Sequence, residues 1–72
     1  MKYEILVEYK RSLHPKFDAK VVELVGKEPY NSYLGGNVRS MEFVFDNKAD
    51  YDNVYKKLSK HADIRVVGGN LR

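Results

Sequence analysis

The order in which two kinds of apolar spacing alternate along this chain constrains its fold more than any other feature. Apolar side chains occupy every second position in residues 3–9 and 41–45, which is typical of strands with one buried face. They recur at three- and four-residue spacing in residues 17–25 and 51–58, which is typical of amphipathic helices. Only a few folds accommodate this alternation of strand and helix within 72 residues.

Turn and capping residues set the limits of these elements. Pro15 suits the first turn of a helix, and Gly26 suits its left-handed end. Asn47, with an acidic residue three positions later, resembles a capping box. We predict strands at residues 2–10, 30–34, 39–45 and 64–67, and helices at residues 15–25 and 48–60. The segment 30–34 is the one strand whose formation the sequence leaves open.

This element order predicts a ferredoxin-like βαββαβ fold, an α+β arrangement in which a four-stranded antiparallel sheet carries two helices on one face. The predicted strand order is 4-1-3-2, with the first and third strands central. A chain of this length buries only about 60% of its unfolded surface, so it forms one thin core. Residues 1–72 are therefore predicted to be a single small domain. Residues 68–72 are predicted to be a flexible tail.

The absence of cysteine bears on where the protein functions. Without cysteine the chain has no disulfide and no thiolate metal site, which favours a reducing compartment. The apolar run at residues 5–7 lies between charged residues and is far too short for a signal peptide or a membrane span. We therefore expect a cytoplasmic protein with no membrane partner.

The segment RSMEFV at residues 39–44 resembles the third-strand signature of RNA-recognition motifs, which begins with a basic residue and alternates aromatic residues. Members of that family bind RNA on the open face of the sheet. In this chain, alternation turns Met41 and Phe43 toward the helices and leaves Ser40 and Glu42 on the open face. We therefore expect no RNA binding of that kind and assign no family.

Three loops of the predicted fold meet at one end of the sheet, and that end is basic. The first helix also points its N-terminus there, where exposed backbone N–H groups favour an anion. We predict that this end binds an anionic ligand: a nucleotide, another phosphate-bearing ligand or a nucleic acid. A solvated loop end without a ligand is the alternative. The candidate residues are Lys10, Arg11, Ser12, His14, Tyr33, Asn37, Arg39, Lys60 and His61.

The sequence contains no catalytic or cofactor motif. It has no Walker loop, no dinucleotide-binding glycine pattern and no pair of carboxylates suited to acid–base work. Ser12 and His14 have no identifiable acid to hold the imidazole, and the two histidines lack metal-ligand spacing. We therefore expect a non-catalytic protein that binds no cofactor and no metal.

The open face of the predicted sheet offers an alternative function. Alternation places aliphatic side chains on this face and charged side chains around them, and such a surface suits a protein partner. The alternative is a protein–protein interaction module, either a small inhibitor or adaptor or a homodimer, that uses this face or an edge strand. The candidate interface residues are Glu4, Leu6, Glu8, Glu42, Val44, Arg65 and Val67.

Overall fold

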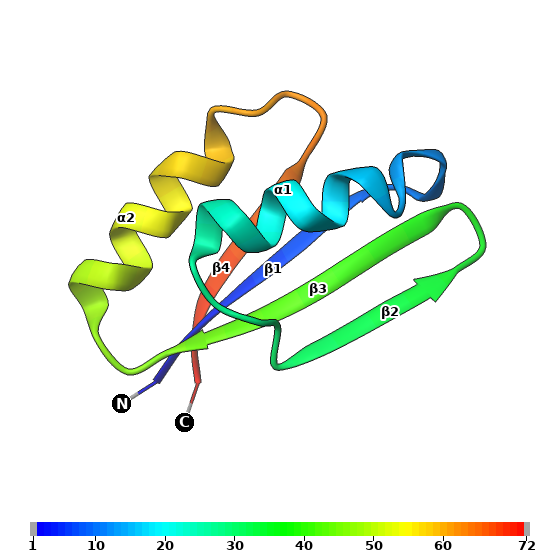
Figure 1. Ribbon diagram of the computed structural model, residues 1–72. Helices are drawn as coiled ribbons and strands as arrows, with labels where there is room; N and C mark the ends of the chain where they lie inside the picture. The colour runs from blue at the N-terminus through cyan, green and yellow to red at the C-terminus, as the bar shows by residue number, and fades with distance from the viewer. Residues whose placement is uncertain (1, 72) are drawn as a thin grey trace.

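The computed structural model describes residues 2–71, which adopt the predicted ferredoxin-like α+β fold. The strands are β1 (Lys2–Lys10), β2 (Asn31–Gly35), β3 (Val38–Phe45) and β4 (Arg65–Leu71). They form one antiparallel sheet in the order β2-β3-β1-β4, which is the predicted order. The helices α1 (Lys16–Val25) and α2 (Lys48–Ser59) lie on one face of the sheet and leave the other face open (Figure 1).

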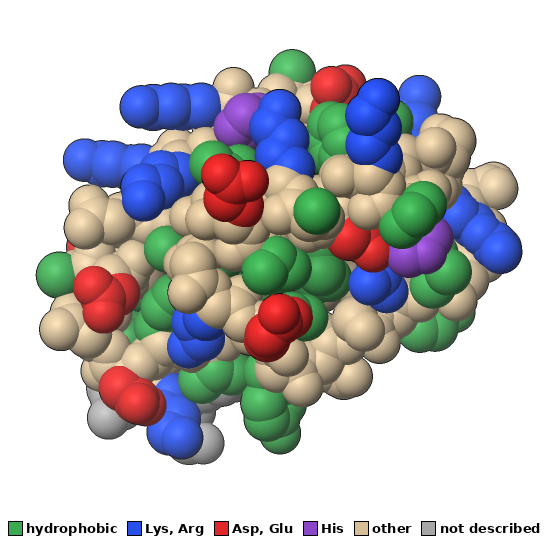
Figure 2. All heavy atoms as spheres, in the orientation of Figure 1, with side chains coloured by type: hydrophobic (Ala, Val, Ile, Leu, Met, Phe, Trp, Pro, Cys, Tyr) green, Lys and Arg blue, Asp and Glu red, His purple; other side chains and the backbone are tan. Residues whose placement is uncertain are grey.

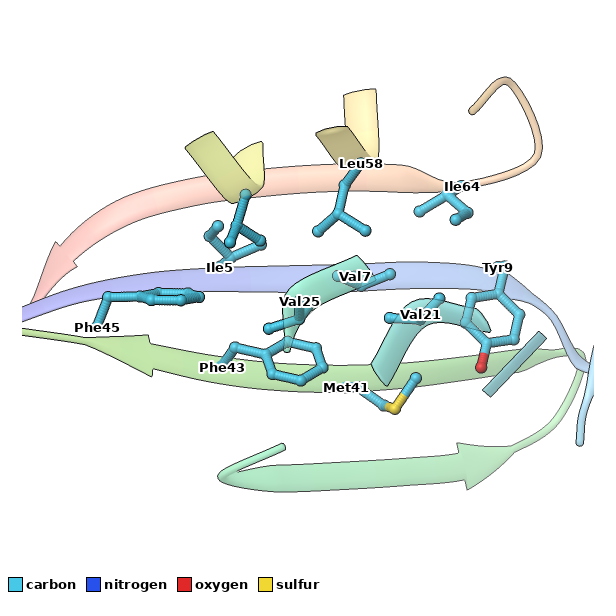
Figure 3. Packing of buried hydrophobic residues seen from close by; sticks show 11 residues of the cluster. Ile5, Val7, Tyr9, Val21, Val25, Met41, Phe43, Phe45, Leu58 and Ile64 are labelled. Atoms are coloured by element: carbon cyan, nitrogen blue, oxygen red, sulfur yellow. The ribbon is translucent and has the colours of Figure 1, made fainter. Parts of the chain in front are cut away.

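The core lies between the sheet and the two helices. Ile5 and Val7 of β1 and Phe43 of β3 are fully buried on the helix side of the sheet. Val21 of α1 and Leu58 of α2 cover them from above and are also fully buried (Figure 3). Alternation along β1 and β3 therefore assigned the buried face correctly.

The predicted caps Gly26 and Asn47 are confirmed, whereas α1 begins at Lys16, one residue after its predicted start at Pro15. Pro15 is the N-cap of α1, and Gly26 ends that helix in the left-handed conformation, with φ of 82°. Asn47 caps α2, since its Oδ1 accepts from the backbone N–H of Ala49 at 2.7 Å and of Asp50 at 3.4 Å. Within the described part of the chain, neither helix is both long enough and apolar enough to cross a membrane.

β2 forms, and it is an edge strand that the helices do not cover (Figure 1). Its residues 31–34 are all exposed, on both faces of the sheet. The backbone N–H of Ser32 donates to Asn31 Oδ1 at 2.9 Å. The strand therefore depends on its backbone pairing with β3, because it contributes no buried side chain to the core.

The predicted tail at residues 68–72 is wrong for the part that the structure describes. β4 continues to Leu71, beyond the predicted end of the strand at residue 67. Gly68 pairs with Ile5, and Leu71 pairs with Lys2, so pairing with a central strand holds this segment in place. Glycines alone indicated a loop, but the backbone pairing outweighs their local preference. Arg72 lies outside the described residues.

A side chain at position 68 would meet tyrosine rings of α2. A Cβ atom at this position would overlap the Tyr51 hydroxyl and lie 2.9 Å from Tyr55 Cε2, whereas a Cβ atom at Gly69 would meet nothing within 4 Å. We expect Gly68→Ala to lower the free energy of unfolding by about 1–3 kcal/mol, the usual cost of overpacking. The control Gly69→Ala should change it by less than about 0.5 kcal/mol in the same urea titration. Equal losses from the two variants would contradict this packing of α2 on β4.

Candidate functional site

The structure brings the loop after β1 into direct contact with the β2–β3 turn. The backbone N–H of Arg11, at the start of a short 3₁₀ helix (η1, Arg11–Leu13), donates to Asn37 O at 2.9 Å. Lys10, Arg11, Ser12 and Asn37 line one hollow on the surface. These four candidates come from two loops and form one corner, as the predicted topology requires.

A carboxylate in the first turn of α1 organises the inner part of this end. Asp18 Oδ2 lies 2.6 Å from His14 Nδ1 and 3.0 Å from Arg39 Nη2. Asp18 Oδ1 accepts hydrogen bonds from the Tyr9 hydroxyl and from Arg39 Nε, the latter at 3.3 Å. An ionised carboxylate only accepts, so His14 carries a hydrogen on Nδ1. The Asp18 and Arg39 side chains are only 19% and 15% exposed, which shields the cluster from water.

These contacts shift the pKa values of the groups involved. Burial by itself disfavours ionisation of Asp18, but the hydrogen bonds from Tyr9, Arg39 and His14 outweigh it and hold the pKa of the carboxyl below its usual value. Burial, followed by the hydrogen bond to Asp18 and the negative charge of that residue, raises the pKa of the Tyr9 hydroxyl well above its usual value. Asp18 is therefore ionised and Tyr9 protonated at neutral pH. Together they fasten α1 to the sheet.

Two of the predicted anion-binding residues belong to this cluster and not to the surface hollow. Arg39 lies within β3, not in a loop, and its charge is paired with Asp18. His14 is held by the same carboxylate, so the expectation that no acid positions its imidazole is also wrong. Arg39 extends the buried alternation of β3 by one position, and His14 precedes Asp18 by four residues. The place of Arg39 in the alternation and the spacing of His14 and Asp18 are the two sequence signals that could have indicated this cluster.

The remaining candidates do not line the Lys10–Arg11 hollow. Tyr33 belongs to β2 and pairs with Ser40, so its side chain lies on the open face of the sheet. Lys60 caps the C-terminus of α2, and His61 follows it. Figure 2 shows the two histidine side chains far apart on the helix side of the molecule. The nine candidates therefore form separate groups at one end of the molecule and do not surround one ligand.

Charge is separated between the two ends of the fold. The end with η1, the start of α1 and the end of α2 carries the cations Lys10, Arg11, Lys16, Lys20, Arg39, Lys60 and Arg65. Its carboxylates are Glu8, Asp18 and Asp63. In the opposite half the balance is reversed: the cations are Lys2, Lys27 and Lys48, and the carboxylates are Glu4, Glu23, Glu28, Glu42, Asp46, Asp50 and Asp52. Two further lysines of α2 line hollows with carboxylates of the opposite half: Lys56 with Asp52, and Lys57 with Asp46 and Asp50. Figure 2 shows Lys and Arg side chains gathered along the upper edge of the helix face.

The alternative interface residues all lie on the open face of the sheet. In the register of the strands, Leu6 of β1 stands between Glu42 of β3 and Val67 of β4. Val67 is 43% exposed. The Arg65 Nε atom lies 4.0 Å from Glu8 Oε1, so part of the charged rim is already paired. The face therefore offers a narrow aliphatic strip.

Neither a metal centre nor a relative helps to define the site further. Among residues 2–71, no group of three or more His, Asp or Glu side chains is arranged to hold a metal ion. The chain matches no protein-family model, no curated protein and no solved structure. The functional argument therefore depends on the geometry and the charge of this end.

Proposed function

We propose that this protein is a small non-catalytic binding module that holds a phosphate-bearing polyanion at its basic end. The observation that carries the proposal is the separation of charge between the two ends of the fold. A surface of one sign raises the local concentration of ligands of the other sign and steers their approach. We place this activity in the cytoplasm, where reducing conditions suit a chain without cysteine.

Most cations of the basic end are available to a ligand. Among the described residues, the ion pairs of this end use only Arg39 and Arg65 as the positive partner, and His14 is held by Asp18. The exposed cations of this end outside these pairs are Lys10, Arg11, Lys16, Lys20 and Lys60. They extend from the loops to α1 and the end of α2, so a ligand with several phosphates matches them better than a single phosphate group does.

The spacing of the helix lysines argues in the same direction. Lys16 and Lys20 are four residues apart on α1, and Lys16 lies at the N-terminus of that helix, where the helix dipole disfavours a cation. Like charges at this spacing destabilise a helix by about 0.2–0.5 kcal/mol per pair. Their repulsion does not stabilise the fold, whereas a bound polyanion would relieve it.

The test is the salt dependence of oligonucleotide binding in two variants of equal net charge. Replacing Lys10 and Arg11 by alanine should weaken binding and flatten the slope of log K against log salt by about 1.4–1.8, since each lost phosphate contact removes about 0.7–0.9. The control replaces Lys2 and Lys48, at the acidic end, and should leave the slope unchanged. Fluorescence anisotropy over a series of salt concentrations measures both.

Two results would count against the proposal. Equal losses in the two double variants would indicate attraction to the overall charge only. No binding of the wild type to any polyanion at low salt would leave the protein–protein module as the stronger candidate.

The exposure of Val67 beside Leu6 favours that second function. Sedimentation would then show whether the partner is a second copy, because Leu6→Lys should convert such a dimer to a monomer.

A further inference from the structure

An exposed aromatic ring lies on the open face of the sheet at the basic end. Tyr33 is 64% exposed, yet its ring lies against the backbone of the edge strand. A Cβ atom at Gly35 would come within 2.6 Å of the Tyr33 hydroxyl oxygen and 2.9 Å of its Cζ. The absence of a side chain at Gly35 therefore lets the ring lie down on the strand, where one side contacts backbone and the rest faces solvent.

The β2–β3 turn connects this ring to two cations of the loop end. Gly35 pairs with Val38, and Val38 pairs with Lys10, so the three positions form a row on the open face. The Arg11 guanidinium lies at the adjoining turn, where Nη1 donates to Gly36 O at 3.4 Å. The register and the turn thus place an exposed aromatic ring on the same corner of the sheet as the exposed cations Lys10 and Arg11.

We propose that Tyr33 is a stacking platform for a nucleobase and that the basic end takes single-stranded nucleic acid. This inference rests on the proposed function and narrows its ligand class. Proteins that bind single strands combine a positively charged track for the backbone with aromatic side chains on which bases stack. Here Tyr33 supplies the aromatic surface, and Lys10 and Arg11 supply the start of the track.

A duplex fits this corner less well. Its bases are already stacked on one another, so their faces cannot reach Tyr33, and only its phosphates meet the cations. The sheet beyond Tyr33 also disfavours a strand that crosses it, because Glu8 and Glu42 lie on the open face of the central strands. In the proposed complex the phosphates of the single strand therefore run from Tyr33 over the β2–β3 turn toward Arg11 and α1.

The experiment compares tyrosine variants on a labelled single-stranded DNA oligonucleotide, its duplex and inorganic polyphosphate. Tyr33→Ala and Tyr33→Leu should weaken single-strand binding by about 5- to 150-fold, the range measured for loss of one stacked base. The same variants should leave duplex and polyphosphate binding almost unchanged. Tyr33→Phe should bind the single strand as the wild type does, since the ring remains.

Tyr30 provides the matched control. It is 76% exposed and precedes β2, at the end of the strand far from the β2–β3 turn, so Tyr30→Ala should have no effect. Circular dichroism verifies that each variant is folded, and Tyr33→Leu keeps an apolar cover over Gly35. Unchanged single-strand binding by Tyr33→Leu, with polyphosphate still bound, would overturn the stacking inference alone. Absence of wild-type binding to all three probes would overturn the proposed function itself.

Discussion

Phe43→Ala is expected to lower the free energy of unfolding by about 3–5 kcal/mol, the usual cost of deleting a buried aromatic side chain. Phe43 is fully buried at the centre of the sheet, between the helices and the strand pair β1 and β3 (Figure 3). A domain of 72 residues has a total stability of about 4–11 kcal/mol at 0.05–0.15 kcal/mol per residue. This one substitution therefore removes a large share of it.

Val44→Ala is the control for this substitution, because Val44 follows Phe43 directly and lies on the open face of the sheet. It should cost less than about 1 kcal/mol, since a half-exposed side chain leaves no closed cavity. Urea titration followed by circular dichroism gives both values. A reversed ranking would mean that the two faces of β3 are assigned the wrong way round.

Asp18→Asn is expected to lower the free energy of unfolding by about 2–3 kcal/mol, somewhat less than the 3–5 kcal/mol for breaking a fully buried ion pair. The substitution leaves the Arg39 guanidinium in a shielded position without its charged partner, and it weakens the contacts to His14 and Tyr9. The control is Asp46→Asn. It removes an ion pair between two exposed side chains, in which Asp46 Oδ1 lies 3.9 Å from Lys2 Nζ. That variant should lose less than about 0.5 kcal/mol.

The pH dependence of the stability difference between the wild type and Asp18→Asn shows whether the charge of Asp18 causes that difference. Because the pKa of Asp18 is lower in the folded protein than its ordinary value of 3.8, the carboxylate stabilises the fold fully above that ordinary value. This contribution is lost as pH falls through the lower, folded pKa. The stability gap between wild type and Asp18→Asn should therefore be constant near neutral pH and shrink below about pH 4. A gap that persists unchanged at pH 2 would show that packing, not charge, is responsible.

The fold followed from alternation and capping because those signals are local and agree with one another. Gly26 and Asn47 mark helix ends through backbone requirements that hold in any tertiary context. Alternation along β1 and β3 identifies the buried face without any knowledge of the partner strands. The strand order then follows from the short connections and the covering helices.

The site was less predictable because charge pairing depends on side chains that are distant in sequence. Arg39 begins a predicted strand but is grouped with the loop cations, and the register shows that it lies on the buried face opposite Tyr9. Only α1 packing over that position brings Asp18 to it, and 21 residues separate the two in the chain. Similarly, the two glycines after Val67 indicate a flexible tail, and only their pairing with β1 shows that they belong to a strand.

The separation of charge affects the protein before any contact forms. A molecule that is positive at one end and negative at the other experiences a torque in the field of a polyanion, so it turns its loop end forward as it approaches. Collisions then begin near the bound orientation, and the association rate falls as salt screens this alignment. In the proposed complex the end with Asp46, Asp50 and Asp52 faces solvent, so the surface that the next molecule meets has the sign of the ligand itself.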